Sequence, residues 1–147
     1  MATPSTPLGP RTRWALTAAA LGLAALLGLA RRLEPDPRGY GTHRQLGLPP
    51  CAFLAATGRP CPSCGMTTAF AWFARGRPLR AWRANPAGSL LAPACAGLIP
   101  WLLAAAAWGR PRGTRTIDTP LTVMVVATVA VCLLAWTVRL VLGRESG

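Results

Sequence analysis

Three long runs of this sequence carry no charged residue, and arginines stand at or near their ends. The runs extend over Trp14–Ala30, Ala84–Gly109 and Thr119–Val138. A helix rises about 1.5 Å per residue, so about 20 apolar residues cross the hydrocarbon core of a bilayer. That core excludes charges, which are tolerated at its two edges. The pattern predicts an all-α integral membrane protein with three transmembrane helices, in a single membrane domain over residues 1–147.

The chain is strongly basic, but its charge is not arranged for nucleic acid. The formal net charge is +12, and all 16 basic residues are arginines. They fall in short clusters beside the apolar runs rather than on one continuous face. With three spans, five of the 16 arginines lie on one side of the membrane and eleven on the other. The positive-inside rule then places the segment between the first two spans in the cytoplasm. The expected partner is the lipid bilayer, and nucleic acid is excluded.

Two of the runs have features that a membrane helix must accommodate. The first run ends in Gly-Leu-Ala at 28–30, which resembles a small-residue cleavage site, so a cleavable secretory signal peptide is its alternative interpretation. The second run contains Pro86, Pro93 and Pro100. Membrane helices tolerate such prolines because neighbouring groups satisfy the carbonyls that are freed. Pro78 suits the first turn of a helix that continues into this run.

The segment between the first two spans is too interrupted to cross the membrane as a regular helix. Residues 33–50 are rich in proline and glycine, which predicts irregular surface structure. Beyond them, Cys51–Ala56 and Met66–Ala74 are apolar enough for two short helical pieces, separated by a break at residues 57–60. We therefore expect the cysteine-motif loop, residues 45–83, to be a re-entrant or interfacial helical loop buried against the spans.

Two cysteines in this loop are separated by only two residues. The motif reads Cys-Pro-Ser-Cys-Gly at residues 61–65. The spacing lets the sulfurs of Cys61 and Cys64 reach one metal ion across a tight turn, as in a zinc knuckle. A closed zinc site needs four ligands. Cys51 is the candidate third ligand and His43, the single histidine, is the candidate fourth. The motif thus predicts a site at the membrane surface, with zinc as the candidate cofactor.

The same cysteines allow two other interpretations. Near the N-terminus of a helix that begins at about Met66, Cys61 or Cys64 would lose its proton more readily. That environment suits a membrane thiol-disulfide oxidoreductase in which the two cysteines are the redox pair. Alternatively, the compact motif is a packing device that lets the loop press on the spans. Cys95 and Cys132 lie inside spans and are expected to pack as small apolar residues.

Polar residues after the motif suggest contacts rather than catalysis. Thr67 and Thr68 suit a helix cap, and Asn85 suits either a hydrogen bond to the cysteine turn or the start of the second span. A basic collar edged by tryptophan suits a membrane adaptor that recruits a partner or anionic lipid. This arginine collar consists of Arg75, Arg77, Arg80, Trp82 and Arg83. A membrane-protein partner and a homo-oligomer are both open. No paired carboxylates or Ser–His–acid arrangement occur, which favours a non-enzymatic role.

The residues around the motif resemble a known family. The stretch T-G-x-P-C-P-x-C-G-x-T at residues 57–67, with Cys51 before it and Asn-Pro at 85–86 after it, is similar to the bacterial membrane-protein family catalogued as domain of unknown function 2752. The resemblance covers residues 51–91, and this chain departs from the family pattern at Ala52 and Arg77. The resemblance implies a small, multi-pass protein of the bacterial inner membrane. It implies no biochemical activity.

Overall fold

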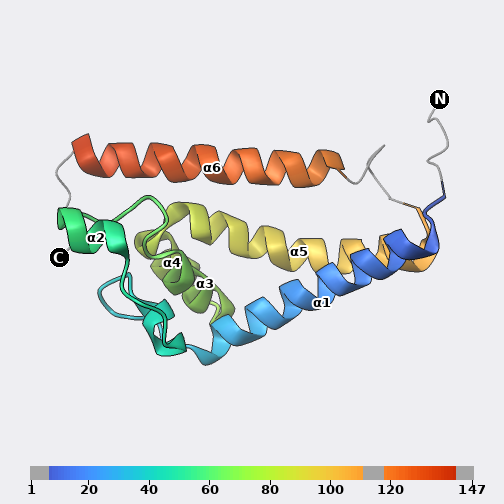
Figure 1. The fold of residues 1–147 in the computed structure, drawn as a ribbon, viewed down its shortest axis with the longest axis horizontal. Helices are drawn as coiled ribbons and strands as arrows, with labels where there is room; N and C mark the ends of the chain where they lie inside the picture. Colours follow the sequence, from blue (N-terminus) through green and yellow to red (C-terminus); the bar gives the residue numbers. More distant parts are fainter. Residues whose placement is uncertain (1–6, 111–117, 142–147) are drawn as a thin grey trace.

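The computed structural model describes residues 7–110 and 118–141, and within them the chain is helical, without a strand. The predicted all-α class is confirmed. Helix α5 (Pro86–Trp108) lies between two other long helices and contacts both (Figure 1); these are α1 (Pro10–Arg32) and α6 (Asp118–Val141). Four short elements gather towards one end of the long helices: η1 (Thr42–Leu46), α2 (Ala52–Thr57), α3 (Met66–Ala74) and α4 (Pro78–Ala84).

Helices α1 and α5 run antiparallel and form the largest contact between elements in the described chain. The buried residues between them are Leu16, Ala20, Leu102, Ala105 and Ala106. Small side chains such as these alanines let two helix backbones approach closely. At the far end, the Arg13 guanidinium donates hydrogen bonds to the carbonyls of Ala106 and Ala107, at 2.6 and 3.0 Å. Arg13 thereby satisfies carbonyls that the end of α5 leaves without a helical partner.

Helix α5 begins at Pro86, two positions after the predicted start at Ala84. Asn85 is extended, with φ −157° and ψ 114°, because the ring of a proline pushes the preceding residue out of the helical region. Helix α4 therefore ends at Ala84, and the expectation that it continues into the second span was wrong. Pro86 instead occupies the first turn of α5, while Pro93 and Pro100 lie inside the helix without ending it.

Within the described residues, two helices are long and apolar enough to cross a membrane. These are α1 and α5, each of 23 residues, which contain the first and second predicted spans. Helix α6 covers the third predicted span, Thr119–Val138, although its apolar stretch of described side chains is the shorter Thr122–Val138. Side chains on its outward face are apolar and exposed, with Val126 62% and Leu134 66% accessible. Such a face is typical of a helix that meets lipid rather than water.

The two short helical pieces predicted around the cysteine motif are present as α2 and α3. Helix α3 positions the motif, because it contacts α1, α4, α5 and η1. Its Ala69 and Ala71 are fully buried. Its Phe70 packs against Ala92 and Cys95 of α5, which is the packing role expected of that cysteine. The cysteine segment is thus anchored where α1 ends and α5 begins.

Candidate metal centre

The Cys-Pro-Ser-Cys-Gly motif forms a tight turn immediately before α3. The amide of Cys64 donates a hydrogen bond to the carbonyl of Cys61 at 3.0 Å. Gly65 has φ +87°, a conformation that strains residues with a Cβ atom. A Cβ at Gly65 would also lie 2.6 Å from the carbonyl oxygens of both Ala84 and Gly39. The glycine therefore lets the turn bend and lets two other segments press against it.

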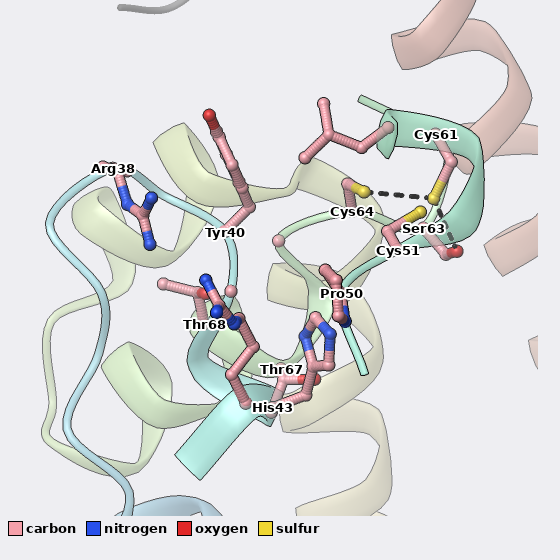
Figure 2. A pocket seen from close by; sticks show the side chains of 14 residues that line it. Arg38, Tyr40, His43, Pro50, Cys51, Cys61, Ser63, Cys64, Thr67 and Thr68 are labelled. Atoms are coloured by element: carbon pink, nitrogen blue, oxygen red, sulfur yellow. Dashed lines mark hydrogen bonds between the residues drawn. The ribbon is translucent and has the colours of Figure 1, made fainter. Parts of the chain in front are cut away.

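Three sulfurs meet at this turn. The Sγ atoms of Cys51, Cys61 and Cys64 all lie within 4.8 Å of one another, and those of Cys61 and Cys64 are 3.2 Å apart. All three cysteines are free thiols (Figure 2). Two thiolates on one tetrahedral zinc ion are about 3.8 Å apart, since each Zn–S distance is about 2.3 Å. The cluster is therefore close to the arrangement in which three thiolates hold one metal ion.

The two thiols of the motif differ in acidity. Burial raises the pKa of Cys61, but hydrogen bonds with Ser63, Cys64 and Cys51 stabilise its thiolate and together bring the pKa below the ordinary value. Burial, followed by the hydrogen bond with Cys61, raises the pKa of Cys64 to about 12. Cys61 therefore ionises first, and a thiolate is the form that binds metals and attacks electrophiles.

Asn85 joins the cysteine turn to the start of α5. Its Nδ2 donates hydrogen bonds to the carbonyls of Pro62 and Cys64, at 3.2 and 3.0 Å. Its Oδ1 accepts a hydrogen bond from the amide of Gly88 at 2.9 Å, which caps α5. The sequence offered these two roles for Asn85 as alternatives, and the buried side chain performs both of them.

The sulfurs line a cavity of ≈290 Å³ that also exposes basic and aromatic side chains. Arg38, Tyr40 and His43 line it with the three cysteines (Figure 2). His43 lies in η1, and its Nε2 is 3.2 Å from the carbonyl oxygen of Pro49. The structure brings the three predicted cysteine ligands together, whereas His43 shares their cavity without joining the group of atoms within 4.8 Å.

Thr67 and Thr68 do not cap α3, so that prediction was wrong. The N-cap position is Gly65, and the cap has no side-chain hydrogen bond. The Thr68 hydroxyl instead lies 2.8 Å from the hydroxyl of Thr42, and both side chains are fully buried. The glycine is needed at the end of the turn, so both threonines fall inside the helix. Thr68 there fastens η1 to α3, while Thr67 lines the cavity.

Residues 51–99 match a family model described as a protein of unknown function, DUF2752. The match covers about a third of the chain, and over these residues the sequence resembles the DUF2752 family. The resemblance that the motif suggested is confirmed, and the DUF2752 segment contains the three clustered cysteines and Asn85. No curated protein and no solved structure matches the chain. Helix α1, η1 and α6 lie outside the DUF2752 segment.

Helix α6 contacts the motif from outside the DUF2752 segment. The Cys132 thiol donates to the carbonyl of Pro62 at 3.0 Å, and the Trp136 indole donates to the carbonyl of Pro60 at 3.1 Å. The Trp136 ring also meets Phe53 of α2 edge-on, with ring centroids 6.3 Å apart. The sequence pattern predicted only packing for Cys132, so these contacts were not predicted. The available signal was two hydrogen-bond donors four residues apart, which share one face of a helix.

The arginine collar divides into an internal and an exposed part. Arg75 donates to the carbonyls of Ala71 and Ala30, at 3.1 and 3.4 Å, and so ties α3 to the end of α1. The guanidinium of Arg80 lies over the Trp72 ring, 4.7 Å from its centroid. The exposed members of the collar are Arg77, Arg80, Trp82 and Arg83. Only this exposed part is available to a lipid surface or a partner.

Proposed function

We propose that this chain is a small integral membrane protein that holds a metal ion, most fittingly zinc, on Cys51, Cys61 and Cys64. The observation that carries the proposal is the meeting of three free thiols within 4.8 Å of one another. Three thiolates of this kind bind zinc and leave a fourth position for a further ligand. His43 lines the same cavity and is the chain's own candidate for that position.

The membrane setting rests on the long helices. Helices α1 and α5 have the length and apolarity of spans, and α6 is the proposed third crossing. The cysteine segment, as a re-entrant or interfacial loop, then lies on the side that carries the larger number of arginines. The positive-inside rule makes that side the cytoplasm, and we assign the protein to the bacterial inner membrane. A reducing cytoplasm keeps thiols free, which suits metal binding.

The acidities of the thiols set the conditions for metal binding. The pKa of Cys61 is lowered, so its thiolate is available first, whereas the high pKa of Cys64 means that the metal must displace that proton. Binding therefore releases protons, and the affinity for zinc rises with pH. We expect zinc to be lost on acidification before the helices unfold, which circular dichroism and metal analysis of the same sample would compare.

Metal analysis of the purified full chain tests this proposal. Protein prepared under reducing conditions should carry about one zinc ion per chain. Replacing Cys51, Cys61 or Cys64 by serine should each remove the zinc. Cys95→Ala is the matched control, since Cys95 is buried among side chains of α1, α3 and α5 away from the cluster. Wild-type protein without stoichiometric metal, or Cys61→Ser protein that retains it, contradicts the proposal.

A thiol-disulfide oxidoreductase is the second candidate function. The observations in its favour are the 3.2 Å separation of the Cys61 and Cys64 sulfurs and their opposite shifts in pKa. In this reaction the Cys61 thiolate attacks a substrate disulfide, and Cys64 then resolves the mixed disulfide. The substrate leaves as two thiols, while Cys61 and Cys64 are left oxidised as a disulfide. Rapid acid trapping in cells tests it, because a pair that stays reduced under oxidative stress is not catalytic.

A membrane adaptor is the third candidate, and it depends on the exposed arginines and Trp82 of the collar. Basic and aromatic side chains of this kind attract anionic lipid headgroups or an acidic partner surface. A membrane-protein partner or a second copy of the chain would use the same surface. Crosslinking in intact membranes, compared between the wild type and a variant with Arg77 and Arg83 changed to glutamine, tests this. Identical crosslinking patterns in the two proteins count against the adaptor.

A further inference from the structure

A second cavity, of ≈330 Å³, lies beside the cavity that contains the thiols. It is lined by residues of α1, η1, α3 and α5 and is almost entirely apolar. The hydrophobic side chains that line it include Leu26, Leu29, Leu33, Leu46, Phe70 and Leu91. Leu26 and Leu29 belong to α1, which is long and apolar enough to cross a membrane, and they are 46% and 42% exposed. The apolar cavity therefore opens along the flank of a proposed membrane helix.

The two cavities adjoin each other. His43 and Thr67 line both of them. In Figure 2 these two side chains lie on the opposite side of the first cavity from the sulfur atoms. The two cavities thus share a boundary at His43 and Thr67, with the thiols on one side of it and the leucines on the other. This polarity is that of an amphiphile that lies across the surface of a bilayer.

Basic side chains line the polar end of the site. Arg38, His43 and Arg44 line the thiol cavity, and no carboxylate among the described residues lines it. Asp36 forms an ion pair with Arg38 at 2.8 Å, so the charge of Arg38 is largely compensated. Arg44 has no such ion pair within the described part of the chain, and the charge of Asp36 acts on it only through space. An anionic group in this cavity would therefore meet Arg44 as its principal cation.

We propose that the two cavities form one binding site for a single anionic phospholipid. Its headgroup lies beside Arg44 and the cysteines, and part of an acyl chain lies among the leucines of the second cavity. The site is separate from the exposed arginine collar, whose Arg77 lines neither cavity. The inference rests on the membrane setting proposed above, but it does not require a bound metal ion.

Native mass spectrometry of the full chain in mild detergent tests the proposal. Phosphatidylglycerol, phosphatidylcholine and soluble glycerol 3-phosphate are titrated separately. We expect one phosphatidylglycerol per chain, bound at least tenfold more tightly than either of the other two. Arg44→Gln should weaken it about fivefold or more, because one desolvated charge-assisted contact is lost. Leu46→Trp should also weaken it by filling the apolar cavity from η1, where Leu46 is 44% exposed and can be enlarged without disturbing the core.

Arg77→Gln is the matched control, because it removes one exposed arginine outside both cavities. Its affinity for phosphatidylglycerol should equal that of the wild type. Equal weakening by Arg77→Gln and Arg44→Gln would overturn the site in favour of general surface attraction. Equal binding of phosphatidylcholine would overturn the role of charge, and equally tight glycerol 3-phosphate would overturn the role of the apolar cavity. Zinc content is measured on the same samples, so lost lipid selectivity with zinc retained refutes this inference alone.

Discussion

Asn85→Ala is the substitution that should disturb the candidate site and the fold together. Asn85 is 2% exposed and uses both ends of its amide. Nδ2 holds the carbonyls of Pro62 and Cys64, and Oδ1 caps α5 through the amide of Gly88. Alanine removes all three hydrogen bonds, and of the two carbonyls only that of Pro62 keeps another described donor, the Cys132 thiol. Asn85→Asp keeps an oxygen acceptor for the cap but removes the donor to the two carbonyls.

The loss of stability expected for Asn85→Ala follows from these contacts. Loss of an N-cap side chain destabilises a helix by about 1 kcal/mol, and each hydrogen bond lost at a partly buried carbonyl costs about 1 kcal/mol more. Asn85→Ala should therefore lower the free energy of unfolding by about 3 kcal/mol on the same scale. Asn85→Asp retains the cap but turns a carboxylate towards two carbonyl oxygens. We expect Asn85→Asp to disturb the cysteine turn as much as Asn85→Ala does, but to preserve the start of α5 better.

Chemical unfolding in detergent micelles, followed by circular dichroism, measures the free energy, and maleimide labelling of Cys61 reports the state of the turn. Ser89→Ala is the control: the Ser89 hydroxyl bonds only the carbonyl of Pro86 in its own helix, at 2.8 Å. Its unfolding and its labelling rate should resemble those of the wild type. If Asn85→Ala unfolds within about 0.5 kcal/mol of the wild type, the range of an ordinary surface substitution, and labels at the wild-type rate, the reasoning is refuted.

Three further substitutions probe single contacts of the turn. Gly65→Ala combines φ +87° with carbonyl oxygens 2.6 Å from the new Cβ, whereas its control Gly58→Ala has φ +69° and no atom within 4 Å of the new Cβ. Gly65→Ala should therefore lower the thermal unfolding temperature more than Gly58→Ala does. Equal decreases contradict the close approach at Gly65. Ser63→Ala should raise the pKa of Cys61, because a hydrogen bond that stabilises its thiolate is lost. The midpoint pH of iodoacetamide labelling at Cys61 should then rise, and an unchanged midpoint counts against that bond. Trp136→Phe should lower the free energy of unfolding by about 1 kcal/mol and speed labelling of Cys61, because the hydrogen bond from α6 to the cysteine segment is lost. Labelling at the wild-type rate contradicts the role of α6.

Patterns with a single physical cause made the helices predictable from the sequence. The first and third uncharged runs fall within α1 and α6, and the second extends slightly beyond α5 at both ends, because both the bilayer and the helix impose a length on an apolar stretch. The break before α5 was also present in the sequence, since Asn85 precedes a proline. It was overlooked because the run of uncharged residues continues through it. Charge pattern marks the extent of a span better than it marks the residue at which the helix begins.

The candidate site was only partly predictable, because its parts are far apart in the chain. Cys61 and Cys64 are close in sequence, and Cys51 was associated with them only because it lies in the same loop. The contacts of Cys132 and Trp136 with this loop depend on how α6 packs, and no local pattern specifies that packing. The buried pair of Thr42 and Thr68 likewise depends on where η1 folds against α3. Local spacing therefore indicated which ligands are present, and tertiary packing determined their surroundings.

Asn85 links the cysteine turn to the start of α5, so that the two cannot move independently. The side chain that caps α5 also holds the carbonyls on either side of Ser63, within the motif. A shift in the first turn of α5 must therefore strain these bonds or move the turn that carries Cys61 and Cys64. Contacts from α6 to Pro60 and Pro62 act on the same turn from another side. The arrangement of the sulfurs thus depends on how α5 and α6 pack, so a metal site here would report the packing of the proposed membrane helices.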